Sequence, residues 1–117
     1  MTEKITRDEL KTKLDRGDDV TLVEALPARY YRHQHLPGAL NIPHDEVREL
    51  AADMLPERSA EIVVYCASGP CRNSAIAAEE LTRLGYTNVR DYHEGKADWV
   101  EAGYPTESGE STQATGR

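Results

Sequence analysis

The chain has 117 residues, with 14 Lys or Arg against 21 Asp or Glu, so its formal net charge is −7. That length suits one domain with one hydrophobic core. The acidic balance argues against non-specific nucleic-acid binding, which uses Lys and Arg to neutralise phosphates. No apolar run is long enough for a transmembrane helix, and no charged-then-apolar leader opens the sequence. We therefore expect a small cytoplasmic domain that binds neither nucleic acid nor membrane.

The first half of the chain predicts two helices around a buried strand. Thr6, with Glu9 three residues later, forms the start signal of a helix. Residues 20–23 are apolar and β-branched with little alternation, which suits a strand covered on both faces. A short extended piece bracketed by prolines follows at residues 36–43, and residues 44–54 then carry apolar side chains at helical spacing.

The second half predicts two strands, each followed by a helix. Residues 62–65 give the strongest strand signal and run directly into Cys66, and a helical pattern covers residues 73–85. A further short strand is expected at residues 89–92, and a final short helix around Trp99. Strands that alternate with helices predict an α/β fold, with a mainly parallel central sheet and helices on both faces.

The composition changes near the C-terminal end. Residues 106–117 are mostly Ser, Thr, Gly and Glu and have almost nothing to bury. We therefore expect one domain over residues 1–105 and a disordered tail over residues 106–117. The sequence shows no internal repeat.

Two cysteines mark the loop that follows the strongest strand, and two are too few for a disulfide scaffold. The strand delivers Cys66 at its carboxyl end, where ligands bind in open α/β sheets. The loop amides and the next helix N-terminus should converge on its sulfur, bind an anion and lower the thiol pKa below about 8.5. Arg72 adds a charged fork suited to an oxyanion. The residues alone leave a second interpretation open, in which Cys66 is a small buried hydrophobe. The loop comprises Ala67, Ser68, Gly69, Pro70, Cys71 and Arg72.

Three blocks of the chain resemble the single-domain rhodaneses, a family of sulfurtransferases. Residues 24–43 end in His-Leu-Pro-Gly-Ala-Leu-Asn-Ile-Pro, which is similar to the family's His-Ile-Pro-Gly-Ala-Ile-Asn-Ile-Pro segment. Residues 63–74 contain the cysteine loop, and residues 84–105 resemble the family's Gly-Tyr-x-Asn-Val ending with its later Trp and Gly-x-Pro. The blocks occur in the family's order over roughly residues 3 to 105, so the resemblance implies a rhodanese-like fold.

The resemblance also implies a reaction. Cys66 would be the catalytic nucleophile, whose thiolate takes the outer sulfur of a donor such as thiosulfate and becomes a persulfide. The loop of residues 67–72 would hold that anion until a thiol or cyanide acceptor removes the sulfur. The implied partners are a small-molecule donor and acceptor, with a protein sulfur acceptor also open. No cofactor is implied, and the cysteine spacing with scattered histidines forms no zinc pattern.

Departures from the family keep two alternative functions open. Many sulfurtransferases place Arg fifth after the catalytic Cys, whereas here Cys71 is fifth and Arg72 is sixth. That longer loop matches related phosphatases and arsenate reductases, although Tyr65 stands where the phosphatases have His. A phosphatase or arsenate reductase is thus one alternative, and a non-catalytic binding module with the rhodanese fold is another.

Three further side chains carry expectations of their own. Cys71 could attack a Cys66 persulfide or form a disulfide with Cys66, or it could simply pack inside the loop. His35 matches a loop histidine of the family, for which we expect a structural hydrogen bond. Where the family usually reads Asp-Val-Arg, this chain has Leu26 in place of Arg, so we expect a charged support near the active site to be missing.

Overall fold

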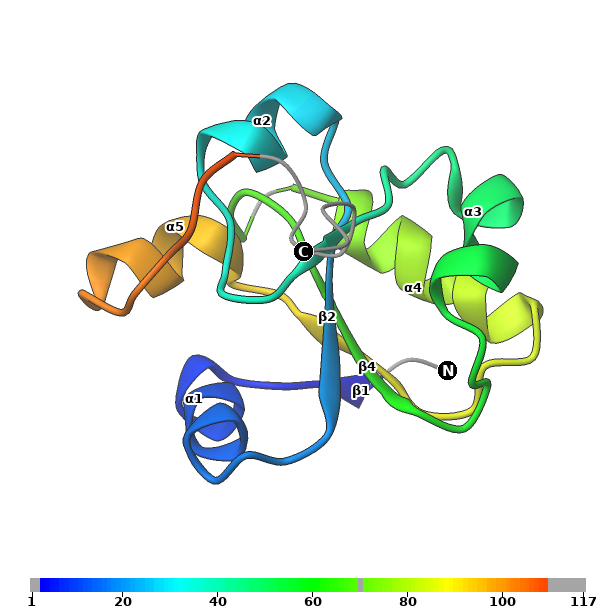
Figure 1. Ribbon diagram of the computed structural model, residues 1–117, viewed down its shortest axis with the longest axis horizontal. Helices are drawn as coiled ribbons and strands as arrows, with labels where there is room; N and C mark the ends of the chain where they lie inside the picture. The colour runs from blue at the N-terminus through cyan, green and yellow to red at the C-terminus, as the bar shows by residue number, and fades with distance from the viewer. Residues whose placement is uncertain (1–2, 70, 110–117) are drawn as a thin grey trace.

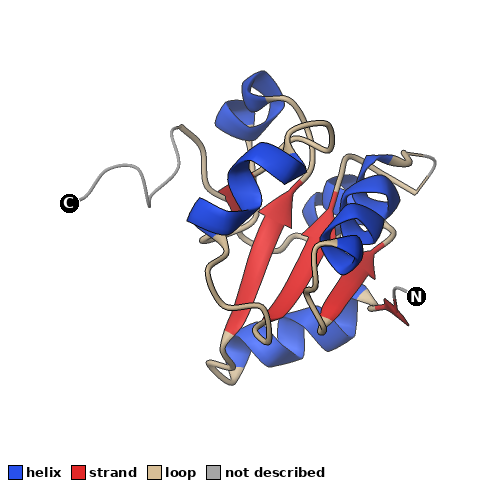
Figure 2. Cartoon of the chain, turned by 90° about the vertical axis from the view of Figure 1, so that its right-hand side faces the viewer, coloured by secondary structure: helices blue, strands red, loops and turns tan. Residues whose placement is uncertain are grey.

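A five-stranded sheet, parallel throughout, forms the centre of the computed structural model, which describes residues 3–69 and 71–109. The strand order is β1-β5-β4-β2-β3, and Figure 2 shows the arrows of the longer strands running in one direction. The strands are β1 (Glu3–Lys4), β2 (Val20–Glu24), β3 (Leu40–Asn41), β4 (Glu61–Tyr65) and β5 (Val89–Tyr92). The helices are α1 (Arg7–Asp15), α2 (Ala28–His33), α3 (Val47–Met54), α4 (Asn73–Arg83) and α5 (Gly95–Glu101).

Both faces of the sheet are covered, as the uninterrupted apolar strands predict. Along β4, Ile62 and Val64 join one core cluster, and Val63 and Tyr65 join the other, because successive side chains of a strand point to opposite faces. Helices α3 and α4 lie over the first face and α1 and α5 over the second (Figure 1). The predicted α/β class with a parallel sheet is confirmed.

Two elements escaped the sequence prediction. Strand β1 pairs with β5 through only two residues, both exposed, so it carries no apolar signal. Helix α2 has six residues, too few for a helical repeat of apolar positions to be recognised. Helix α3 begins at Val47, three residues after the predicted start at His44.

The chain beyond residue 105 differs from the expected tail. Residues His35 and Glu107 form an antiparallel bridge, with both backbone N–H···O distances at 2.8 Å. The Gly109 N–H also donates to the Arg32 carbonyl at 2.7 Å. Residues 106–109 are therefore held against the end of α2 and the segment after it by backbone hydrogen bonds. Such bonds need no apolar side chains, so the composition of the tail does not predict them. The rest of the predicted tail lies outside the described residues.

The helices of the described ranges are short, and none is both long and apolar enough to cross a membrane. Helix α4, the longest, has eleven residues. It packs against the sheet through Ala77, Ala78 and Leu81, which are all at most 1% exposed. This packing fixes the position of its N-terminus beside the cysteine loop.

We expect Leu81→Ala to lower the free energy of unfolding by about 2 to 5 kcal/mol, because it leaves a cavity between α4 and the sheet. Ile76→Ala is the matched control on the same helix, since Ile76 is 46% exposed, and its effect should stay within about 1 kcal/mol. Urea denaturation followed by circular dichroism measures both. Equal losses would show that α4 is not anchored through Leu81.

Candidate active site

Cys66 follows the last residue of the central strand β4 and is 1% exposed. The alternation of β4 directs Tyr65 toward α5, and Cys66 toward α4 on the other face. There the Cys66 Sγ lies 3.6 Å from the Ser74 Oγ in the first turn of α4. The predicted meeting of the strand end and the helix start is present in the structure.

Helix α4 begins without a side-chain cap. Its N-cap residue is Arg72, which makes no capping hydrogen bond, and the first helical bond to it comes from the Ile76 N–H at 3.0 Å. The backbone N–H of Ser74, together with its hydroxyl, instead stabilises the ionised Cys66. These two donors belong to the predicted helix N-terminus, whereas an anion cradle formed by residues 67–72 stays a prediction, and Pro70 lies outside the described residues.

The predicted low pKa of the Cys66 thiol is wrong for this structure. The pKa is raised to about 11, first by burial and then by the neighbouring Cys71, with the hydroxyl and N–H of Ser74 acting in the opposite direction. The sequence indicates the hydrogen-bond donors around the sulfur but not the loss of water on burial. That loss disfavours the thiolate and outweighs the donors. The resting thiol of Cys66 is therefore neutral near pH 7.5.

The start of the cysteine loop is attached to α5. The carbonyls of Cys66 and Ala67 accept hydrogen bonds from the N–H groups of Lys96 and Ala97, each at 2.8 Å. Gly95, at φ +77°, allows this contact, because an added Cβ there would stand 2.7 Å from the Cys66 carbonyl oxygen. The two carbonyls therefore point toward the N-terminus of α5.

The far side of the loop is more open. Cys71 is half-buried and donates its N–H to the Ser68 carbonyl at 3.0 Å. Cys71 and Arg72 line an open pocket of about 710 Å³, together with Ile76 and His93. Arg72 is exposed, and no carboxylate in the described ranges pairs with it, so its guanidinium is available to an anionic ligand.

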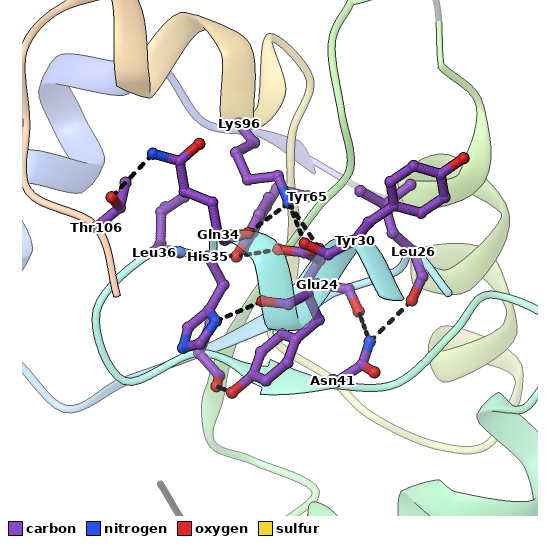
Figure 3. A network of polar contacts seen from close by, with 12 residues as sticks. Glu24, Leu26, Tyr30, Gln34, His35, Leu36, Asn41, Tyr65, Lys96 and Thr106 are labelled. Carbon is purple, nitrogen blue, oxygen red and sulfur yellow. Dashed lines mark hydrogen bonds and ion pairs between the residues drawn. The ribbon is translucent and has the colours of Figure 1, made fainter. Parts of the chain in front are cut away.

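A buried charge lies on the α5 face of the sheet, beside Tyr65 at the end of β4 (Figure 3). Glu24 is fully buried at the end of β2, in register with Tyr65 on β4. Its carboxylate accepts a hydrogen bond from the Tyr65 hydroxyl at 2.8 Å and pairs with the Lys96 Nζ at 2.9 Å. Burial raises the pKa of Glu24, and Lys96 and Tyr65 oppose that rise.

Lys96 supplies the charged support that the sequence appeared to lack. Leu26 is buried, so no Arg stands there, but Lys96 reaches Glu24 from 72 residues away in the chain. Its Nζ also donates to the carbonyls of Tyr30 and Gln34, at 3.2 and 2.5 Å. No local pattern reveals this residue, because its partners come from β2 and α2. The Arg is therefore absent at position 26 as expected, and a different cation, Lys96, lies on the α5 side of the sheet.

His35 has the structural role that the sequence predicts. Its ring stacks on Tyr31 with centroids 3.8 Å apart, and its Nδ1 lies 2.8 Å from the Tyr31 carbonyl. The Tyr31 hydroxyl donates in turn to the Ala39 carbonyl.

Trp99 is a core residue, 1% exposed. Within residues 3–69 and 71–109, no three His, Cys, Asp or Glu side chains gather as metal ligands would.

Comparison with known families now decides the identity of this fold. Residues 6–102 match the model of the rhodanese-like domain. The chain belongs to the rhodanese-like family. Among solved structures, this rhodanese domain is similar to the rhodanese-like domain of the Alr3790 protein from Anabaena, with 28% identity and a TM-score of 0.82. That similarity covers 92% of this chain and 80% of the other.

This rhodanese domain is similar in sequence to two curated relatives. The HTH-type transcriptional regulator Rv0324 of Mycobacterium tuberculosis is 35% identical over 92% of this chain and 46% of its own length. The thiosulfate sulfurtransferase PspE of Escherichia coli is 41% identical over 52% of this chain and 57% of its own length. The chain thus spans about half the length of these relatives.

We expect Lys96→Met to lower the free energy of unfolding by about 3 to 5 kcal/mol at pH 7.5, because it leaves the Glu24 carboxylate buried without a cation. The loss should be smaller at pH 4.5. Removing Lys96 raises the folded-state pKa of Glu24 further, and a raised carboxyl pKa costs stability only as the pH climbs above the unfolded value. Urea denaturation at the two pH values measures this difference.

The control for that variant is Arg16→Met, which removes an exposed ion pair with Asp18 and should have little effect on the free energy of unfolding, because solvent screens exposed pairs. A Lys96→Met loss that is the same at pH 4.5 and 7.5 would contradict the role assigned to the Glu24 charge.

The alkylation rate of Cys66 should report its high pKa. With iodoacetamide, the rate should rise about tenfold per pH unit between pH 7 and 10. Ser74→Ala should slow it at fixed pH by about three- to tenfold, because the thiolate loses one hydrogen bond. Fragmentation of the tryptic peptide of residues 59–72 separates modification at Cys66 from that at Cys71.

Ser68→Ala is the matched control in the same loop, since the Ser68 side chain makes no hydrogen bond within the described ranges. It should leave the rate at Cys66 within about twofold. A rate that is flat above pH 8 would contradict the high pKa of Cys66.

Proposed function

We propose that this rhodanese domain is a sulfurtransferase, in which Cys66 takes sulfane sulfur from a donor such as thiosulfate and passes it to a thiol acceptor. The observation that carries the proposal is the position of Cys66 at the carboxyl end of β4, with its sulfur against the first turn of α4. In parallel α/β sheets this end of the strands is where ligands bind. The similarity of this chain to PspE, a relative named a thiosulfate sulfurtransferase, supports the same chemistry.

The proposed transfer has two steps. The Cys66 thiolate attacks the outer sulfur of thiosulfate, a sulfur–sulfur bond forms at Cys66, and the bond to the sulfonate breaks with release of sulfite. A thiol or cyanide acceptor then attacks the outer sulfur of the persulfide and restores the Cys66 thiolate. The Ser74 N–H and hydroxyl stabilise the anion at Cys66, and Arg72 at the pocket attracts the anionic donor.

The raised pKa of Cys66 gives this reaction a distinctive pH dependence. Only the thiolate is nucleophilic, and the resting thiol ionises with a pKa of about 11. The rate of persulfide formation should therefore increase with pH well beyond the range in which an ordinary cysteine, with a pKa of about 8.5, is already ionised. Reduced thiol acceptors are abundant in the cytoplasm, and the proposal places the protein there.

One observation favours a second candidate, a non-catalytic module that keeps the fold. Cys66 is 1% exposed and its thiol resists ionisation, which is also what a structural cysteine would show. The name of the relative Rv0324, a transcriptional regulator, is compatible with a binding role. The phosphatase or arsenate reductase alternative is not favoured, because the comparisons support sulfur chemistry instead.

The test of the proposal is thiocyanate formation from thiosulfate and cyanide, together with sulfite release in a single turnover. We expect about one equivalent of sulfite per chain, and a loss of at least about 1,000-fold in thiocyanate formation for Cys66→Ser. The turnover rate should rise between pH 7 and 9. Circular dichroism should confirm that Cys66→Ser remains folded.

If the wild-type chain releases no sulfite and its Cys66 resists alkylation at pH 9, the non-catalytic module is the correct function. Sulfite release that persists in Cys66→Ser would assign the nucleophile to another residue.

A further inference from the structure

A second thiol lies against the proposed nucleophile. Cys66 and Cys71 are both free in the structure, and the Cys71 side chain interacts directly with the Cys66 sulfur. Burial raises the pKa of Cys66 most, and the interaction with Cys71 is the second-largest cause of the rise. The sulfur atom that would carry a persulfide therefore already has another sulfur as its neighbour.

Cys71 is held in this position by backbone contacts on both sides. Its N–H donates to the Ser68 carbonyl at 3.0 Å, so the chain folds back toward Cys66. The next residue, Arg72, is the N-cap of α4, and its carbonyl accepts the Ile76 N–H at 3.0 Å. On the opposite side of the loop, the carbonyl of Cys66 is attached to α5 through the Lys96 N–H. The two thiols meet between fixed points, which lowers the entropic cost of joining them.

The two thiols differ in their access to solvent. Cys66 is 1% exposed, whereas Cys71 is half-buried and lines the open pocket beside Arg72. Exchange between thiols and disulfides depends on which sulfur a reagent can reach. A reagent in the pocket meets Cys71 before it meets Cys66.

We propose that Cys71 is a second catalytic residue, which attacks the Cys66 persulfide at the Cys66 sulfur and releases hydrosulfide. A bond forms between the sulfur atoms of Cys66 and Cys71, and the bond from Cys66 to the sulfane sulfur breaks. The leaving sulfur takes the electron pair and departs as hydrosulfide, so the two cysteines are oxidised to a disulfide and the sulfane sulfur is reduced. This inference rests on the proposed function, because it needs a persulfide at Cys66.

The geometry selects the inner sulfur as the point of attack. In the resting structure the neighbour of Cys71 is the Cys66 sulfur itself, whereas the transferred sulfur extends one bond beyond it. Closing the disulfide joins two side chains that already interact. The product then needs reduction by an external thiol or dithiol, and the pocket gives such a reductant access to Cys71. In the net reaction, the thiols of Cys66 and Cys71 react with one thiosulfate and give the Cys66–Cys71 disulfide, hydrosulfide and sulfite.

The experiment follows one turnover of the reduced full chain with about one equivalent of thiosulfate, without air, cyanide or added thiol. We expect the wild-type protein to release about one equivalent each of sulfite and sulfide, and its peptide of residues 59–72 to lose about 2 Da as the disulfide forms. Cys71→Ser, once loaded, should keep the added sulfur as a gain of about 32 Da and release no sulfide. Cys66→Ser should show neither mass change.

The outcomes separate this inference from the function on which it rests. Release of sulfite with a lasting gain of about 32 Da and no sulfide in the wild type would overturn the role of Cys71 and leave the sulfurtransferase proposal intact. Absence of sulfite would overturn both. The wild-type measurement decides the matter even if Cys71→Ser folds poorly, and Cys71→Ala provides a second variant with the same expected result.

Discussion

A single lysine connects the buried charge of this domain to its reactive loop. The Lys96 side chain pairs with Glu24, which is fully buried behind the sheet, while the Lys96 backbone N–H holds the Cys66 carbonyl. Glu24 at the end of β2 would otherwise be an uncompensated charge in the core, which costs several kcal/mol. Satisfying it requires α5 to approach the ends of β2 and β4. The same approach orients the start of the cysteine loop.

The surroundings of Cys66 place two physical effects in opposition. The first turn of α4 offers an N–H and a hydroxyl from Ser74, which favour the thiolate, whereas burial and the contact with Cys71 favour the neutral thiol. Burial dominates in the resting structure. Arg72 lies at the pocket and makes no ion pair within the described ranges, although Glu79 and Asp91 also line that pocket.

The predicted parts of the fold were those with a local pattern. The strands around Leu22 and Val63 are apolar on both faces, and such strands are buried between helices wherever they occur. The start of α1 at Thr6 carries a complete capping box, which the structure contains. Strand β1 was missed because its two residues, Glu3 and Lys4, are exposed and pair only through their backbones. Its existence depends on β5, which is distant in the chain.

The sequence by itself determined the α/β class, the position of Cys66 at a strand end and the family to which the chain belongs, because these depend on neighbouring residues and ordered motifs. Only the tertiary structure decided the protonation of Cys66, since burial depends on what packs over the loop. It also decided that Lys96 is the cation that pairs with the buried Glu24. Both outcomes arise from contacts between residues far apart in the chain, whose distances no local pattern encodes.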